Sequence, residues 1–336
     1  MDEFAWSMAR SVYPFLASVA AMGIFLNSVL LWATLRAKFL RSTTNLLIGI
    51  CAVFDIMHET GYFIQFPILF SNYFIDSLYC SCMQLLPAIG RAAGAVCVLC
   101  IGVDRMMCIV ATVAYKGMKK AHLLICHLLT ISIFCGWTVY LMIAYWIPKQ
   151  QICSMPAPFH GESLGLWSNS ITIVNIFSAF IYFVTWQAVK RKEDSEYKHK
   201  IFHSIAVVMA VEVTGWFISS ILIDMTKIYV VPERRPPFHY VACLFVNSGI
   251  AVKAIVYYSI SGEYRRAIRF VLSLPPTNEV STTEIQASWA TSQYTPLDET
   301  GVAAAPTKIH KIVPLPVKRP AYQKRIRPVY RNSIVV

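Results

Sequence analysis

Long runs of apolar residues dominate the chain up to about residue 260. A helix needs about 20 mostly apolar residues to cross the hydrocarbon core of a bilayer. Stretches of at least this kind lie near 12–35, 44–70, 78–111, 122–146, 167–190, 200–225 and 237–260. The runs are long and continuous rather than short and alternating, which favours helices over a β-barrel. The pattern therefore predicts an all-α membrane protein, a seven-transmembrane helix bundle.

The remaining segments suggest how the chain is divided. Residues 1–11 form a short segment before the first run, and we expect the bundle over 12–262. Residues 275–336 contain scattered Pro, Ser and Thr and no apolar run long enough to pack, which predicts a disordered basic cytoplasmic tail. Such a tail can lie on anionic lipid or stay solvated, and both interpretations remain open.

Composition supports the membrane assignment. Hydrophobic residues make up 56% of the chain and charged residues only 14%, against roughly 25% charged in ordinary globular domains. The net charge of +12 could indicate a nucleic-acid partner. However, the basic residues are divided among short loops and the tail, with no soluble fold to present them. We therefore expect the lipid bilayer, and no nucleic acid, as a partner.

Basic residues are concentrated in alternate loops. The loops after the first, third, fifth and seventh runs contain Arg36, Lys38 and Arg41; Lys116, Lys119 and Lys120; Lys190, Arg191, Lys192, Lys198 and Lys200; and Arg265, Arg266 and Arg269. The other loops are poorer, although Lys227, Arg234 and Arg235 break the trend. Because positive loops stay in the cytoplasm, the amino terminus is expected outside a plasma membrane and the tail inside.

Three cysteines fall on the expected outer side. Cys80 and Cys82 begin the third run, and Cys153 lies in the outer loop before the fifth. The outside of a cell is oxidising, so a disulfide between Cys153 and one of the first two is expected. It would hold the outer loop over the mouth of the bundle.

Ionisable residues inside the apolar runs are candidates for function, because a charge is costly to place in a bilayer. They are Asp55, His58 and Glu59 in the second run, Arg91 in the third, Glu212 in the sixth and Lys253 in the seventh. The first three share one helix face, since residues three and four apart are neighbours on a helix.

Residues distributed over 12–272 resemble the rhodopsin-like G-protein-coupled receptors. They are Asn27, Asp55, Cys80, Asp104-Arg105-Met106, Tyr115, Trp137 and Trp216. Lys38–Ser42 and Tyr257–Arg266 resemble the corresponding segments of the nematode serpentine chemoreceptors of the Srsx type. The second segment is similar to the end of a seventh span that runs into a short amphipathic helix, which we place at 263–274.

The resemblance implies a partner and a mechanism. Arg105 would meet a heterotrimeric G protein when the sixth span moves outward, and Asp104, Tyr115 and Tyr257 would belong to the same coupling site. Lys198 stands where many members carry an acid that holds this arginine, so appreciable basal signalling is expected. The family's disulfide position falls on Cys80, which implies a Cys80–Cys153 bridge.

Two departures from the family concern the centre of the bundle. In the family, the residue matching Asp55 helps to hold a sodium ion with a hydroxyl and an Asn, but Gly94 and Lys253 occupy those places here. We expect the Lys253 ammonium to replace the ion and pair with Asp55, with Glu212 as a second candidate partner. A retinal-binding lysine would fall near Asn247, so no cofactor is expected.

The ligand would be an unknown small molecule in a cavity at the level of Arg91. Gln84 and Trp216 would line this cavity, together with Glu59. Two interpretations remain open. Arg91 and Glu59 pair and stiffen the bundle, or Arg91 faces an open cavity and binds an anionic ligand.

These observations favour a chemosensory receptor that activates a G protein, with a sensory cilium as a candidate location. A seven-span transporter or channel that uses the intramembrane charges is one alternative. A degenerate receptor that does not couple is the other. The sequence contains no metal-ligand cluster and no nucleophile–base arrangement, so an enzyme is not expected.

Overall fold

The computed structural model describes residues 3–71, 73–191, 196–231 and 234–275. Side chains of several residues in the first half of the sixth long helix, including Lys198 and Glu212, lie outside this description. The predicted tail from residue 275 also lies outside it, apart from its first residue.

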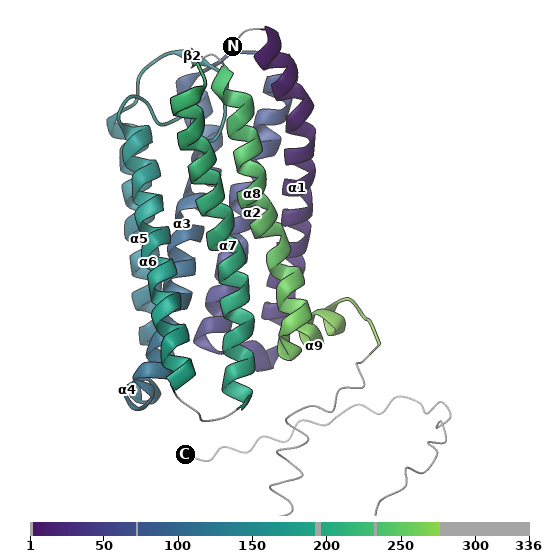
Figure 1. Cartoon of the computed structure of the whole chain (residues 1–336), viewed down its shortest axis with the longest axis vertical. Helices are drawn as coiled ribbons and strands as arrows, with labels where there is room; N and C mark the ends of the chain where they lie inside the picture. The colour runs from purple at the N-terminus through teal and green to yellow at the C-terminus, as the bar shows by residue number, and fades with distance from the viewer. Residues whose placement is uncertain (1–2, 72, 192–195, 232–233, 276–336) are drawn as a thin grey trace, which may run out of the picture. The chain divides into compact units, whose positions relative to one another are not determined.

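Long helices lie side by side through the described part of the chain (Figure 1). They are α1 (Glu3–Arg36), α2 (Thr43–Ser71), α3 (Ser77–Val110), α5 (Lys120–Ala144), α6 (Ser163–Arg191), α7 (Glu196–Tyr229) and α8 (Arg235–Ile260). All of these except α7, whose first half is only partly described, are long and apolar enough to cross a membrane. The predicted all-α seven-helix bundle is confirmed.

Short elements mark the two ends of the bundle. The 3-10 helix η1 (Lys38–Leu40) follows α1, α4 (Thr112–Gly117) follows α3, and α9 (Gly262–Val271) follows α8. In Figure 1, α4 and α9 lie at the end opposite to β2 and the start of α1. The strands β1 (Ile75–Asp76) and β2 (Gln150–Gln151) pair antiparallel at that opposite end. We refer to the α4 and α9 end as the inner end and to the β1–β2 end as the outer end.

The observed helices begin and end within a few residues of the predicted spans, except at the start of α1. This helix begins at Glu3, so most of the segment expected to precede the bundle is helical. Ala5, Ala9 and Tyr13 are fully buried and stand four residues apart, hence on one helix face. The early turns therefore pack against the bundle rather than forming a separate terminal segment.

Helix α9 is the predicted amphipathic helix, observed at Gly262–Val271 rather than 263–274. Its buried face consists of Tyr264, Ala267 and Ile268. At its start, the Ser261 hydroxyl accepts a hydrogen bond from the Tyr264 N–H at 3.4 Å, which caps the helix. The exposed Arg266 places its guanidinium 4.1 Å from the centre of the Phe39 ring.

Helices α2 and α3 approach most closely at Gly90. A Cβ atom at this position would lie 2.6 Å from the backbone nitrogen of His58, so a larger residue would force the helices apart. The close approach brings the polar face of α2, which carries Asp55 and His58, against the turn of α3 that carries Arg91. It positions the charged centre described below.

Candidate functional site

The inner end is organised around the buried carboxylate of Asp104 on α3. It accepts hydrogen bonds from the Thr44 hydroxyl on α2 and from the Tyr115 hydroxyl on α4, the latter at 2.9 Å. The neighbouring Arg105 places its Nε 3.8 Å from Asp104 Oδ2. One carboxylate thus links three helices, and Thr44 is a member of the cluster that sequence reasoning missed.

The two hydroxyl donors leave Arg105 only loosely held. Its Nε has no hydrogen-bond partner among the described residues, and its side chain is 17% exposed. Burial and the nearby Asp104 charge raise the pKa of Tyr115 to about 12, so its phenol stays protonated and keeps donating. Arg105 therefore retains donor groups that a partner at the inner end could use.

Tyr257 lies deeper, where α8 meets α9. It is 1% exposed, and its ring centre is 4.9 Å from that of Tyr264. The Thr34 hydroxyl on α1 lies 3.5 Å from the Tyr264 hydroxyl. Tyr257 is therefore packed at the junction of α1, α8 and α9.

An ion pair joins α2 to α8 in the middle of the bundle. Lys253 Nζ lies 2.5 Å from Asp55 Oδ2 and 3.3 Å from Cys51 Sγ. The Lys253 and Asp55 side chains are only 2% and 4% exposed. The structure thus brings together the two residues expected to neutralise each other, while the side chain of Glu212, the second candidate, lies outside the described residues.

Arg91 and Glu59 point to different sides of the bundle. The Arg91 guanidinium contacts two indoles, with its Cζ 4.7 Å from the Trp216 ring centre and 5.1 Å from that of Trp167. A Cβ atom at Gly23 on α1 would lie 3.0 Å from Glu59 Oε1, so this carboxyl faces α1. The Arg91–Glu59 ion pair, one of the two interpretations left open by the sequence, is therefore absent among the described residues.

A small cavity lies beside Arg91. The space open to the centre of a water molecule is about 10 Å³, and its lining residues are Asp55, His58, Gly90, Arg91, Gly94, Ala95, Trp216 and Ile250. Of the expected ligand-site residues, Arg91 and Trp216 thus line this cavity, whereas Glu59 and Gln84 do not. The buried Gln84 instead lies 3.4 Å from the Gly61 carbonyl, to which its amide donates.

The outer loop is held to α3 by the Cys80–Cys153 disulfide, which confirms the expected bridge. Cys82 is a free, exposed thiol. The Ser77 hydroxyl at the start of α3 also donates to the Ile147 carbonyl at 2.8 Å. These contacts fix the loop at the point where it crosses the outer end.

The same loop fills the mouth of the bundle with apolar side chains. Met155 and Phe159 are each 4% exposed. The Phe159 ring stacks on Trp167 with 4.2 Å between centres, and Trp167 in turn contacts the Arg91 guanidinium. The sequence analysis singled out none of Met155, Phe159 and Trp167. A signal was available for Trp167, because this large aromatic residue stands at the start of the fifth apolar run.

His160 closes this loop in its neutral form. Its Nδ1 accepts a hydrogen bond from the Ile147 N–H at 2.8 Å. Burial, helped by the Lys149 charge, lowers the pKa of His160 below its ordinary value of 6.5. The loop geometry therefore depends on an imidazole that does not carry a proton on Nδ1.

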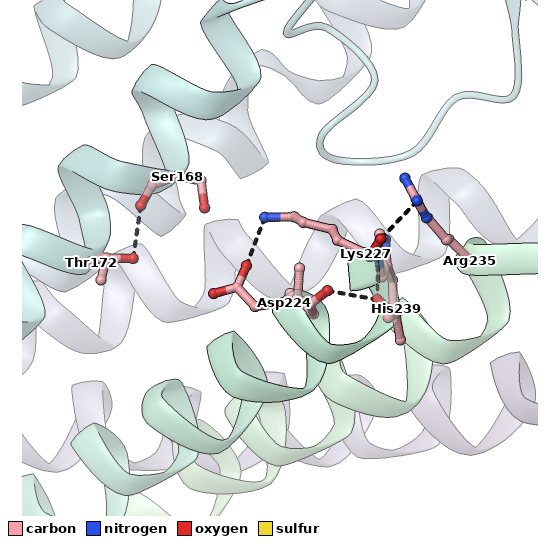
Figure 2. A network of polar contacts seen from close by, with 8 residues as sticks. Ser168, Thr172, Asp224, Lys227, Arg235 and His239 are labelled. Atoms are coloured by element: carbon pink, nitrogen blue, oxygen red, sulfur yellow. Dashed lines mark hydrogen bonds and ion pairs between the residues drawn. The ribbon is translucent and has the colours of Figure 1, made fainter. Parts of the chain in front are cut away.

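The connection between α7 and α8 explains the exception in the charge pattern. Figure 2 shows Lys227 reaching Asp224, with Arg235 and His239 beside them; the Lys227–Asp224 distance is 2.8 Å. Arg235 donates to the carbonyls of Val230 and Lys227, each at 2.9 Å, at the end of α7. The Asp224 carboxylate thus offsets the charge of Lys227. The carbonyls at the end of α7 stabilise Arg235, because the carboxyl end of a helix favours cations.

Comparison with known proteins yields one family. The model of the serpentine type 7TM GPCR chemoreceptor Srsx family matches residues 20–272, from the middle of α1 to the end of α9. No curated protein sequence matches the chain significantly.

Proposed function

The chain belongs to the Srsx family of serpentine seven-transmembrane chemoreceptors, and we propose that it binds a small ligand among its helices and activates a heterotrimeric G protein. It is a multi-pass membrane protein. We place it in the plasma membrane with the amino terminus outside, following the distribution of basic residues. A sensory cilium is the compartment in which such a receptor would act.

The arrangement around Arg105 carries the proposal. Asp104 accepts hydrogen bonds from Thr44 and Tyr115, and the Arg105 Nε makes a 3.8 Å ion pair with it but no hydrogen bond among the described residues. A guanidinium offers several donors in a fixed planar array. A modest displacement of the neighbouring helices would let these donors bind the backbone carbonyls at the end of a G-protein helix.

Arg105→Ala tests the coupling role. In membranes containing the full chain and a panel of heterotrimeric G proteins, we expect basal nucleotide exchange that Arg105→Ala abolishes. Arg36→Ala is the matched control, because Arg36 is an exposed arginine at the inner end of α1. Exchange that survives Arg105→Ala at the wild-type rate, with equal surface expression, contradicts the proposal.

The alternatives are separated by the same variants. A transporter or channel would keep its ion current in Arg105→Ala, and a non-coupling receptor would reach the membrane without supporting exchange. No observation among the described residues favours transport. Asp55 and Lys253 neutralise each other, Glu59 faces α1, and Arg91 is enclosed by indoles.

A further inference from the structure

Arg91 is a cation without a carboxylate partner in the described part of the bundle. The two acids of α2, whose side chains the structure describes, are engaged or turned away: Asp55 pairs with Lys253, and Glu59 faces Gly23. The guanidinium contacts two indoles, and its Nε is buried without a hydrogen-bond partner among the described residues. A desolvated charge needs polar partners to offset its cost, and cation–π contacts alone do not use its N–H groups.

His58 presents a second unsatisfied group to the same cavity. The imidazole is 1% exposed, its ring lies within reach of the Asn247 side chain, and neither ring nitrogen makes a hydrogen bond of good geometry among the described residues. The nearby Asn247 amide donates to the Tyr62 hydroxyl and the Cys243 carbonyl instead. Buried polar groups in folded proteins are normally hydrogen-bonded. A ring nitrogen of His58 and the Nε of Arg91 therefore indicate that a hydrogen-bond acceptor can bind between them.

We propose that Arg91 and His58 form a binding site for a small monovalent anion. The anion is either the carboxylate head of the receptor's ligand or free chloride. If the anion is the carboxylate of a receptor ligand, the inference rests on the proposed receptor function. An anion site as such does not require that function. The cavity has room for about one water-sized group, which fits a head group or a halide.

The surroundings favour an anion over a water molecule. The indole contacts do not use the N–H groups of Arg91, and the planar N–H array of a guanidinium matches a carboxylate oxygen. Asp55 also lines the cavity and would repel an anion, but Lys253 neutralises it at 2.5 Å. Among the described residues that line the cavity the net charge is therefore positive, and partial burial strengthens the attraction to an anion.

The experiment measures anion-dependent stability of the full chain in nanodiscs. Thermal unfolding is followed at constant ionic strength with benzoate, its neutral isostere benzamide, chloride, and the larger anion gluconate. We expect benzoate or chloride to raise the melting temperature of the wild type over benzamide and gluconate. A shift from benzoate alone identifies a ligand carboxylate as the source, and a shift from chloride identifies a free halide.

Two variants assign the effect to the site. Arg91→Gln should weaken binding of the stabilising anion by at least about tenfold, since it removes a charge-assisted hydrogen bond. Arg91→Lys keeps the charge and should retain part of the response. Arg234→Gln, at the exposed outer rim, is the matched control and should leave the response unchanged. If Arg91→Gln does not fold, His58→Phe serves in its place.

Three results would overturn the proposal. They are equal shifts from benzoate and benzamide without a shift from chloride, an undiminished anion response in Arg91→Gln or His58→Phe, and no anion-dependent shift in the wild type. No G protein is present in this assay. Its failure therefore leaves the receptor function standing, and a failed exchange assay leaves the anion site standing.

Discussion

Replacing Lys253 by methionine tests the buried ion pair directly. The change removes the ammonium that lies 2.5 Å from Asp55 and keeps a flexible side chain of similar length. The Asp55 carboxylate then loses this compensating charge in a site that is 4% exposed. We expect a loss of about 3–5 kcal/mol in the free energy of unfolding, the usual cost of removing one partner of a buried pair.

Thermal unfolding in nanodiscs measures this loss. A thiol-reactive dye reports unfolding, because Cys97 and Cys100 are free and buried in the folded chain. At about 2–4 °C per kcal/mol, the melting temperature should fall by roughly 6–20 °C. Asp55→Leu alone should have a similar effect, because it removes the carboxylate nearest to the ammonium.

The double variant Asp55→Leu with Lys253→Met decides whether the two residues act as a pair. Replacing both charges by apolar groups is often close to neutral, so the double variant should be more stable than the sum of the single losses. Lys227→Met is the control, since Lys227 and Asp224 are 2.8 Å apart but exposed; its effect should stay below about 1 kcal/mol. Strictly additive single losses would refute the pairing.

Three further outcomes are expected. Replacing sodium by potassium should leave melting temperature and basal exchange unchanged, because Lys253 already neutralises Asp55; a sodium-dependent shift contradicts this. Cys153→Ser should cost about 4 kcal/mol, since the disulfide spans 73 residues; unfolding curves with Cys82→Ser as control measure it, and equal curves reject it. For His160, the unfolded imidazole binds a proton near pH 6.5 whereas the folded one resists it. Stability from this group is therefore lost as pH falls below about 6.5, and His160→Asn should reduce the melting-temperature loss between neutral pH and pH 5; an unchanged loss rejects the role.

Most of the fold follows from the length of the apolar runs. A run long enough to cross a bilayer has to satisfy its backbone internally, which leaves the helix as the outcome. The start of α1 was predicted too late because Ser7, Arg10 and Ser11 interrupt the apolar run around Ala5 and Ala9. Their burial depends on neighbouring helices that the local pattern does not show.

Contacts in the candidate site could be predicted only for residues that have few possible partners. Asp55 and Lys253 could be paired from sequence, because charges inside a bilayer have few choices of partner. Arg91 and Glu59 could not be separated in this way, since the rotation of α2 toward α1 decides where Glu59 points. The residues of the outer loop lie outside any helical period, so nothing in their spacing indicated that Met155 and Phe159 enter the bundle.

The loop that fills the outer mouth has a consequence for timing. A molecule arriving from outside must displace Met155 and Phe159 before it reaches Arg91, and the disulfide at Cys153 limits how far the loop can move. Association that requires such a rearrangement is slower than diffusion allows, and the same barrier delays departure. We expect long occupancy after each binding event, so that the response follows average exposure rather than brief fluctuations.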